Sequence, residues 1–78
     1  MNIRIRKHIN AEDIGKIWTL ADETVELERR YDSENDTNIK ARISLSMTNN
    51  FRDVRLLGEE AMRMYVTCLE ILRDRRSA

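Results

Sequence analysis

Hydrophobic residues recur at helical spacing between residues 11 and 30, and this pattern predicts the first helix. The apolar positions are Ile14, Ile17, Trp18, Ala21, Val25 and Leu27. Intervals of three and four residues place such positions on one face of an α-helix. Asn10 is a preferred N-cap residue, Asp13 follows it at capping-box spacing, and Ile9 and Ile14 stand at hydrophobic-staple positions. We expect a helix from about residue 11 to residue 30.

Residues 31–38 are polar and rich in turn formers, so we expect them to connect this helix to the next. Helical spacing then resumes and holds its phase over residues 39–74. The apolar positions of this span are Ile39, Ile43, Met47, Phe51, Val54, Leu57, Ala61, Met64 or Tyr65, Cys68 and Leu72. One continuous helix would make an antiparallel helical hairpin, whereas a broken helix would make a small three-helix bundle.

The weakest part of this second span is residues 44–50, where Ser, Thr and Asn are poor helix formers. Asn50 followed by Asp53 also resembles a second cap. Against a break, the chain has no proline and only two glycines, a scarcity that favours long uninterrupted helices. We favour a continuous or merely kinked helix, and either outcome gives an all-α fold.

Residues 1–9 follow a different pattern, with apolar and basic side chains in alternation. Ile3, Ile5 and Lys7 fall on one side, and Arg4, Arg6 and His8 fall on the other. A period of two predicts a short extended N-terminal arm. A lone strand is unstable in water, so this arm must pair, and a second copy of the chain could provide the pairing strand.

The span 51–74 has more apolar surface than one neighbouring helix can cover. A helix that is apolar over so wide an arc is usually buried on more than one side. The surplus residues are Leu56, Met62, Val66, Leu69 and Ile71. We predict that these residues contact another protein or a second chain.

Size and cysteine content point to self-association. A chain of 78 residues is one domain close to the lower limit for independent folding, and such domains gain stability from disulfides, a metal or oligomerisation. Cys68 is the only cysteine, and together with His8 it gives too few soft ligands for zinc, which takes about four. We therefore expect a homo-oligomer, with a homodimer as the simplest form, in a reducing cytoplasmic compartment.

No apolar run approaches the roughly 20 residues of a membrane span, and no signal-peptide pattern follows the basic start. We therefore expect a soluble protein without a membrane partner. Fourteen basic and fourteen acidic residues give a net charge of zero, so there is no overall attraction to nucleic acid. Residues 11–36 have a net charge of −6, whereas residues 1–10 and 37–78 have +3 each. We interpret this asymmetry as attraction between an acidic first helix and a basic second half folded back against it, and a basic binding surface is the alternative.

Side chains with catalytic potential are few and isolated. His8 has no acid beside it, Cys68 lies on an apolar helix seam, and adjacent acids such as Glu59 and Glu60 point about 100° apart on a helix. Residues 32–36 lack the glycine and the final glutamate of a calcium loop, and no glycine-rich phosphate loop is present. We predict that the protein is not an enzyme and binds no metal or cofactor.

Two hypotheses of function follow. The first is a small helical regulator, adaptor or inhibitor that docks an apolar helical face on a larger protein partner. The alternative is a nucleic-acid-binding regulator in which Arg4, Arg6, Lys7 and His8 of a dimer form a basic ribbon, although the neutral net charge weighs against it. A small-ligand site at an oligomer interface, built from arginines and Trp18 or Tyr65, is a third interpretation.

Overall fold

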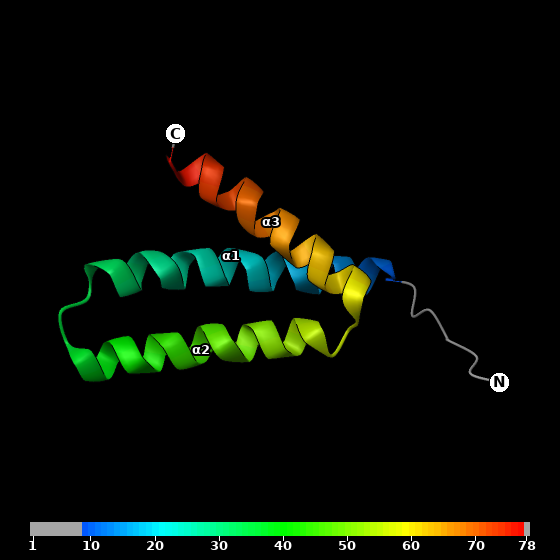
Figure 1. Ribbon diagram of the computed structural model, residues 1–78. Helices are drawn as coiled ribbons and strands as arrows, with labels where there is room; N and C mark the ends of the chain where they lie inside the picture. The colour runs from blue at the N-terminus through cyan, green and yellow to red at the C-terminus, as the bar shows by residue number, and fades with distance from the viewer. Residues whose placement is uncertain (1–8, 78) are drawn as a thin grey trace.

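The computed structural model describes residues 9–77, and this part of the chain is an all-α three-helix bundle. The helices are α1 (Ala11–Ser33), α2 (Thr37–Arg55) and α3 (Glu59–Ser77). Figure 1 shows α1 and α2 side by side and antiparallel, with α3 crossing α1 at an angle and rising away from α2. Most interhelical packing therefore involves α1, which lies against both other helices. Strands are absent from the described residues.

The start of α1 is confirmed, and its end lies three residues later than expected. The Asn10 side chain accepts a hydrogen bond from the backbone N–H of Asp13 at 2.8 Å, which caps the helix. At the other end, the Ser33 hydroxyl donates to the carbonyl oxygens of Arg29 and Arg30, and the N–H of Glu34 bonds to the Tyr31 carbonyl. These local bonds satisfy groups that a helix end leaves open, so the turn formers extend α1.

The connection between α1 and α2 is consequently three residues long, Glu34 to Asp36, and shorter than the eight expected. Asp36 caps α2, because its carboxylate accepts the N–H groups of Asn38 at 2.8 Å and Ile39 at 3.3 Å. The ammonium of Lys40 lies 4.5 Å from the centre of the Tyr31 ring, which ties the start of α2 to the end of α1.

The continuous second helix that the sequence favours is wrong, and so is the expected position of the break. Residues 44–50 are helical, and the chain breaks at residues 56–58. Gly58 has a φ of +107°, and the N–H groups of Leu57 and Gly58 bond to the carbonyls of Val54 and Arg55. Only glycine adopts such a φ without strain, so α2 ends there and α3 begins in a new direction.

Polar residues within 44–50 are tolerated because their side chains find partners without breaking the helix. The Thr48 hydroxyl donates to the Ser44 carbonyl at 3.0 Å. Asn50, expected as a cap, is buried at the centre of the bundle and hydrogen-bonds to α1. Tertiary packing therefore overrides weak helix propensity here.

The core lies along α1 and is closed by α3, with a smaller contribution from α2. Its buried members are Ile17, Ala21, Val25, Val54, Ala61, Tyr65, Cys68 and Leu69. Ile17 and Val54 are the largest side chains that are fully buried. The small residues Ala21 and Ala61 are also wholly inaccessible, which permits close approach of helices at those positions. Ile9 packs partly buried against this core, whereas the rest of the expected N-terminal arm lies outside the described residues.

Candidate interaction surface

One side chain from each helix contributes to a buried polar network that fixes the three helices relative to one another. The hydroxyl oxygens of Thr24 on α1 and Tyr65 on α3 lie 2.6 Å apart, and either can donate. Asn50 on α2 donates to the Thr24 hydroxyl and to the Glu23 carboxylate, both at 3.2 Å. Burial raises the pKa of Tyr65, which therefore remains a protonated hydrogen-bonding group at neutral pH. Within residues 9–77 every buried side-chain nitrogen and oxygen has a partner.

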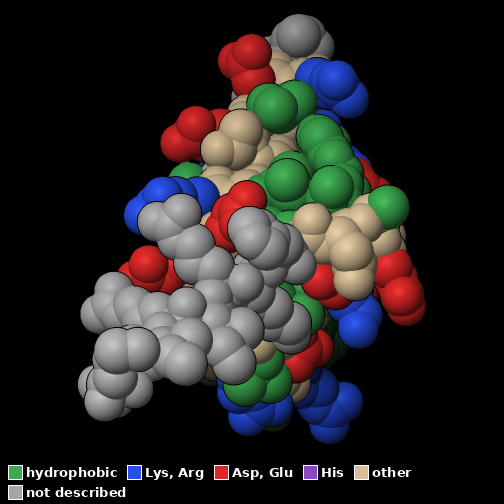
Figure 2. Space-filling model, turned by 90° about the vertical axis from the view of Figure 1, so that its right-hand side faces the viewer, with side chains coloured by type: hydrophobic (Ala, Val, Ile, Leu, Met, Phe, Trp, Pro, Cys, Tyr) green, Lys and Arg blue, Asp and Glu red, His purple; other side chains and the backbone are tan. Residues whose placement is uncertain are grey.

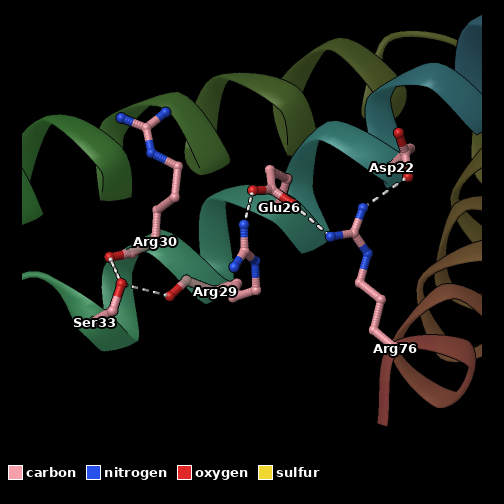
Figure 3. Close-up of polar contacts among 6 residues, drawn as sticks. All are labelled: Asp22, Glu26, Arg29, Arg30, Ser33 and Arg76. Carbon is pink, nitrogen blue, oxygen red and sulfur yellow. Dashed lines mark hydrogen bonds and ion pairs between the residues drawn. The ribbon is translucent and has the colours of Figure 1, made fainter. Parts of the chain in front are cut away.

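A second set of contacts, which we call the arginine clasp, joins the end of α3 to α1. It consists of Arg73 and Arg76 on α3 with Asp22, Glu26 and Glu28 on α1. Arg73 makes a two-pronged contact with Glu28, and Arg76 reaches Glu26 and, at 3.2 Å, Asp22. Figure 3 shows Arg76 pointing from α3 toward the two acids, with Arg29 approaching Glu26 from within α1.

The clasp accounts for part of the charge asymmetry of the sequence. The hydrogen bonds that Arg29 and Arg76 donate hold the pKa of Glu26 below its ordinary value. Donation to Glu28 raises the pKa of Arg73, and donation to Glu26 raises the pKa of Arg76. The expected attraction between the acidic first helix and the basic second half is thus observed. The bases that take part belong to α3, which does not run back along α1 but in broadly the same direction (Figure 1). The charges are largely exposed, so each pair contributes modestly to stability.

The five residues predicted to contact a partner are not brought to one surface. Leu69 is 8% exposed and belongs to the core, whereas Val66 is 46% exposed. Met62, half-buried, lies one turn before Val66, so these two residues and Leu69 share one edge of the core-facing stripe of α3. Ile71, 37% exposed, falls at the opposite edge, one turn after Cys68. We call the edge formed by Met62, Val66 and Leu69 the Val66 edge.

Leu56 is separated from the other four because it ends α2. It is 75% exposed, the highest value among the large hydrophobic residues of the described chain. On one side it borders an open groove of about 410 Å³ between α1 and α2, lined by Lys16, Leu20, Asp53, Leu56 and Leu57. The groove mixes apolar walls with one cation and one anion and contains no converging set of catalytic side chains.

Leu56 also belongs to an exposed row of residues on the outer face of α2. We call this row the α2 outer stripe; its members, at intervals of four, three, four and four, are Ala41, Leu45, Thr48, Arg52 and Leu56. All five are exposed, with Leu45 at 61%. Leu56 keeps helical backbone angles and its N–H bonds to the Arg52 carbonyl at 3.1 Å, so the stripe is continuous to its end. Sequence reasoning missed Leu45, although its spacing from Leu56 on the side opposite Ile43 and Val54 was visible.

The outer side of α2 is also basic. The helix has four cations, Lys40, Arg42, Arg52 and Arg55, and one acid, Asp53. None of these cations forms an ion pair with a carboxylate in the described part of the chain. Lys40 lies over Tyr31 and Arg52 donates to Asn49, but the guanidinium groups of Arg42 and Arg55 have no hydrogen-bond partner among the described residues. The charge of α2 is therefore not neutralised by carboxylates of the described residues, whereas Arg73 and Arg76 of α3 pair with acids of α1.

Further hydrophobic side chains are exposed on α1 and α3. Figure 2 views the end at which α1 begins and α2 ends, and hydrophobic side chains form a continuous surface in its upper half, where α3 rises above α1. The exposed large hydrophobic residues of α1 and α3 are Ile14, Trp18, Val66 and Ile71. On α2, Phe51 is 46% exposed, although its spacing placed it on the core face. Because α3 diverges from α2, a side chain expected in a continuous seam is left about half exposed.

The residues of the other hypotheses are placed as follows. Arg4, Arg6, Lys7 and His8, the nucleic-acid candidates, lie outside the described residues. Of the two aromatic residues considered for a small-ligand site, Tyr65 is 2% exposed and Trp18 is 36% exposed. Between residues 9 and 77, no three His, Cys, Asp or Glu side chains gather as metal ligands, and no helix is long and apolar enough to span a membrane.

Comparison of the chain with models of known protein families, with curated proteins and with solved structures finds no match.

Proposed function

We propose that this protein is a small helical interaction protein, a regulator, adaptor or inhibitor that docks on a larger protein through the Val66 edge of α3. The observation that supports this most directly is the 46% exposure of Val66 beside half-buried Met62 and buried Leu69. An apolar side chain of a partner placed there would contact the edge of the existing core, and the apolar area buried by this contact would favour binding. Met62 suits such a site because methionine adapts its shape to a partner.

We further propose a homo-oligomer and a cytoplasmic setting. Small size motivates the first, since a second copy could cover the same edge. The single buried thiol, Cys68, motivates the second, because burial raises its pKa and keeps it unreactive. Measurement of the solution mass by light scattering distinguishes a second copy from a different protein as the occupant of the edge.

Introduction of a negative charge at Val66 tests the proposed function. Val66→Glu places a carboxylate at an exposed position, so the bundle is expected to fold. Binding of a partner there would bury the carboxylate and remove its hydration, which weakens docking. The measurement is affinity capture of the tagged full chain from nuclease-treated extract, with captured proteins quantified by mass spectrometry. A stoichiometric protein should be lost from the Val66→Glu sample, or the light-scattering mass should fall if the occupant is a second copy.

Two controls make the result specific. Thr67→Glu adds the same charge at an exposed polar neighbour, and Ile71→Glu adds it at an exposed aliphatic residue on the opposite edge of α3. Both should retain the partner, and circular dichroism should show equal helicity in all variants. Capture that is unaffected by Val66→Glu, or lost only in Ile71→Glu, would contradict the Val66 edge as the docking surface. Capture that disappears with nuclease alone would favour the nucleic-acid alternative.

A further inference from the structure

We propose that the α2 outer stripe is a second docking surface, and that its partner is an acidic amphipathic helix of another protein. This surface lies on a different helix from the Val66 edge, so the proposal extends the proposed function and either one can fail alone. It is based on exposed leucines that lie on one helix face together with arginines that form no ion pair with any carboxylate of residues 9–77.

The apolar part of the surface has the spacing of a helix-recognition site. Leu45 and Leu56 are 61% and 75% exposed, and they lie 11 residues apart, roughly 16 Å along the helix axis. Between them the stripe has Thr48 and Arg52, and the small residue Ala41 lies one turn before Leu45. A partner helix laid along α2 would place its own apolar side chains between the two leucines at i, i+4 and i+7 spacing.

The charged part of the surface specifies the sign of the partner. Arg42 lies one turn before Leu45, Arg52 belongs to the stripe itself one turn before Leu56, and Arg55 is next to Leu56, so cations lie at both ends of the stripe. The arginines of α3 differ, because Arg73 and Arg76 already contact the acids of α1. Guanidinium groups that border an apolar stripe are matched by carboxylates placed on either side of a partner's apolar face.

An acidic helix accounts for the surface better than nucleic acid does. A phosphate backbone is bound by cations alone, and contact with it would leave the two most exposed leucines of the described chain against a polar strand. The neutral net charge of the protein also provides little long-range attraction to a polyanion. The acidic helix α1 of a second copy is a poorer occupant, since Asp22, Glu26 and Glu28 are held in the arginine clasp.

The test uses two fluorescein-labelled peptides of about 18 residues, roughly 27 Å of helix. Both have leucine at intervals of four, three and four on an alanine-rich helix; one has glutamate at the flanking positions and the other has glutamine. Binding to the full-length protein is measured by fluorescence anisotropy. We expect the glutamate peptide to bind at least about tenfold more tightly than the glutamine peptide, and its affinity to fall as the salt concentration rises from about 50 to about 500 mM.

Variants of the protein locate the site. Leu45→Ser with Leu56→Ser, and separately Arg42→Glu with Arg55→Glu, should each weaken binding of the glutamate peptide by about tenfold or more. Arg63→Glu, an exposed arginine on α3, and Val66→Glu are the matched controls and should leave the affinity within about twofold. Circular dichroism confirms that each variant is folded.

Three outcomes would overturn the proposal. The first is equal affinity for the two peptides or no binding of either one. The second is binding that survives the α2 variants. The third is tighter binding to a duplex DNA or RNA oligonucleotide that displaces the peptide. Because Val66→Glu is a control here and the decisive change in the capture experiment, failure on α2 is distinguishable from failure of the Val66 edge.

Discussion

At the scale of single residues, Thr24 connects the three helices. Its hydroxyl is the only group in the buried network that contacts both Asn50 and Tyr65, and no other polar pair among the described residues links α1 to α3 in the interior. Loss of one partner destabilises a buried network more than an exposed one, because a buried polar group without a partner is no longer hydrogen-bonded to water either. The network should therefore contribute as a unit to the stability of the bundle.

A double-mutant cycle measures this coupling. Tyr65→Phe is expected to lower the free energy of unfolding by about 1–2 kcal/mol, because Thr24 loses one of two buried partners. Thr24→Val should cost more, since Tyr65 and Asn50 both lose a partner. The double variant should cost clearly less than the sum, as measured by urea unfolding. Tyr31→Phe, a tyrosine outside the network, serves as the control, and strictly additive single effects would show that the three side chains do not act together.

At the scale of elements, the turn at residues 56–58 decides the architecture. Without it, α2 and α3 would be one rod, and the apolar residues of α3 could not fold back onto α1. Gly58 makes the turn possible through its φ of +107°, whereas Gly15, the other glycine, is an ordinary exposed position within α1. An added Cβ would meet no atom within 4 Å at either glycine, so backbone conformation alone separates the two.

The two glycines should therefore respond to alanine with opposite signs. Gly58→Ala is expected to destabilise the protein by about 1–2 kcal/mol, because an L-residue is strained at this φ. Gly15→Ala should stabilise it by about 0.5–1 kcal/mol, since alanine is the better helix former and the site is open. Thermal and urea unfolding of both variants provide the comparison. A neutral or stabilising effect of Gly58→Ala would mean that the turn does not depend on the positive φ.

At the scale of the whole molecule, α3 is attached to α1 by the core at its beginning and middle and by the arginine clasp at its end. Glu26 is the centre of the clasp, facing Arg76 of α3 as well as Arg29 of its own helix, with Asp22 one turn away. Because the folded state lowers the pKa of Glu26, its contribution to stability is present above the ordinary value of 4.5 and is lost as pH falls through the folded pKa. The attachment of α3 should thus weaken on the acid side.

This sign can be checked by thermal unfolding between about pH 3 and pH 7 at low salt. The midpoint temperature of unfolding of the unsubstituted protein is expected to decrease once the pH is below about 4.5. Glu26→Gln should make this decrease smaller and should lower the midpoint temperature at neutral pH. Glu59→Gln, an exposed acid outside the clasp, should leave the profile unchanged in shape. Parallel profiles for the native chain and Glu26→Gln would show that the clasp does not contribute.

Features that depend on local chemistry can be predicted from the amino-acid sequence alone. The all-α class followed from the period of the apolar residues, and the start of α1 followed from Asn10, whose cap involves only a residue three positions away. The attraction between acidic and basic segments was also legible, since composition along the chain sets it. The cap could be predicted because its partners are neighbours in sequence. The clasp joins residues 45 to 54 positions apart, so the sequence indicated the signs of the charges and not the pairs.

The helix boundaries within residues 37–77 and the choice of core residues depend on tertiary packing. Residues 44–50 have weak helix propensity, differences of a few tenths of a kcal/mol per residue, and burial of Ile43, Asn50 and Val54 outweighs it. The break falls at residues 56–58, where the positive φ of Gly58 ends the helix and α3 turns back onto α1. The same placement buries Leu69 and exposes Val66, a distinction that spacing along α3 could not make, since its apolar arc is wider than one neighbouring helix can cover. Which apolar residues form the core and which remain for a partner is therefore set by the path of α3 across α1.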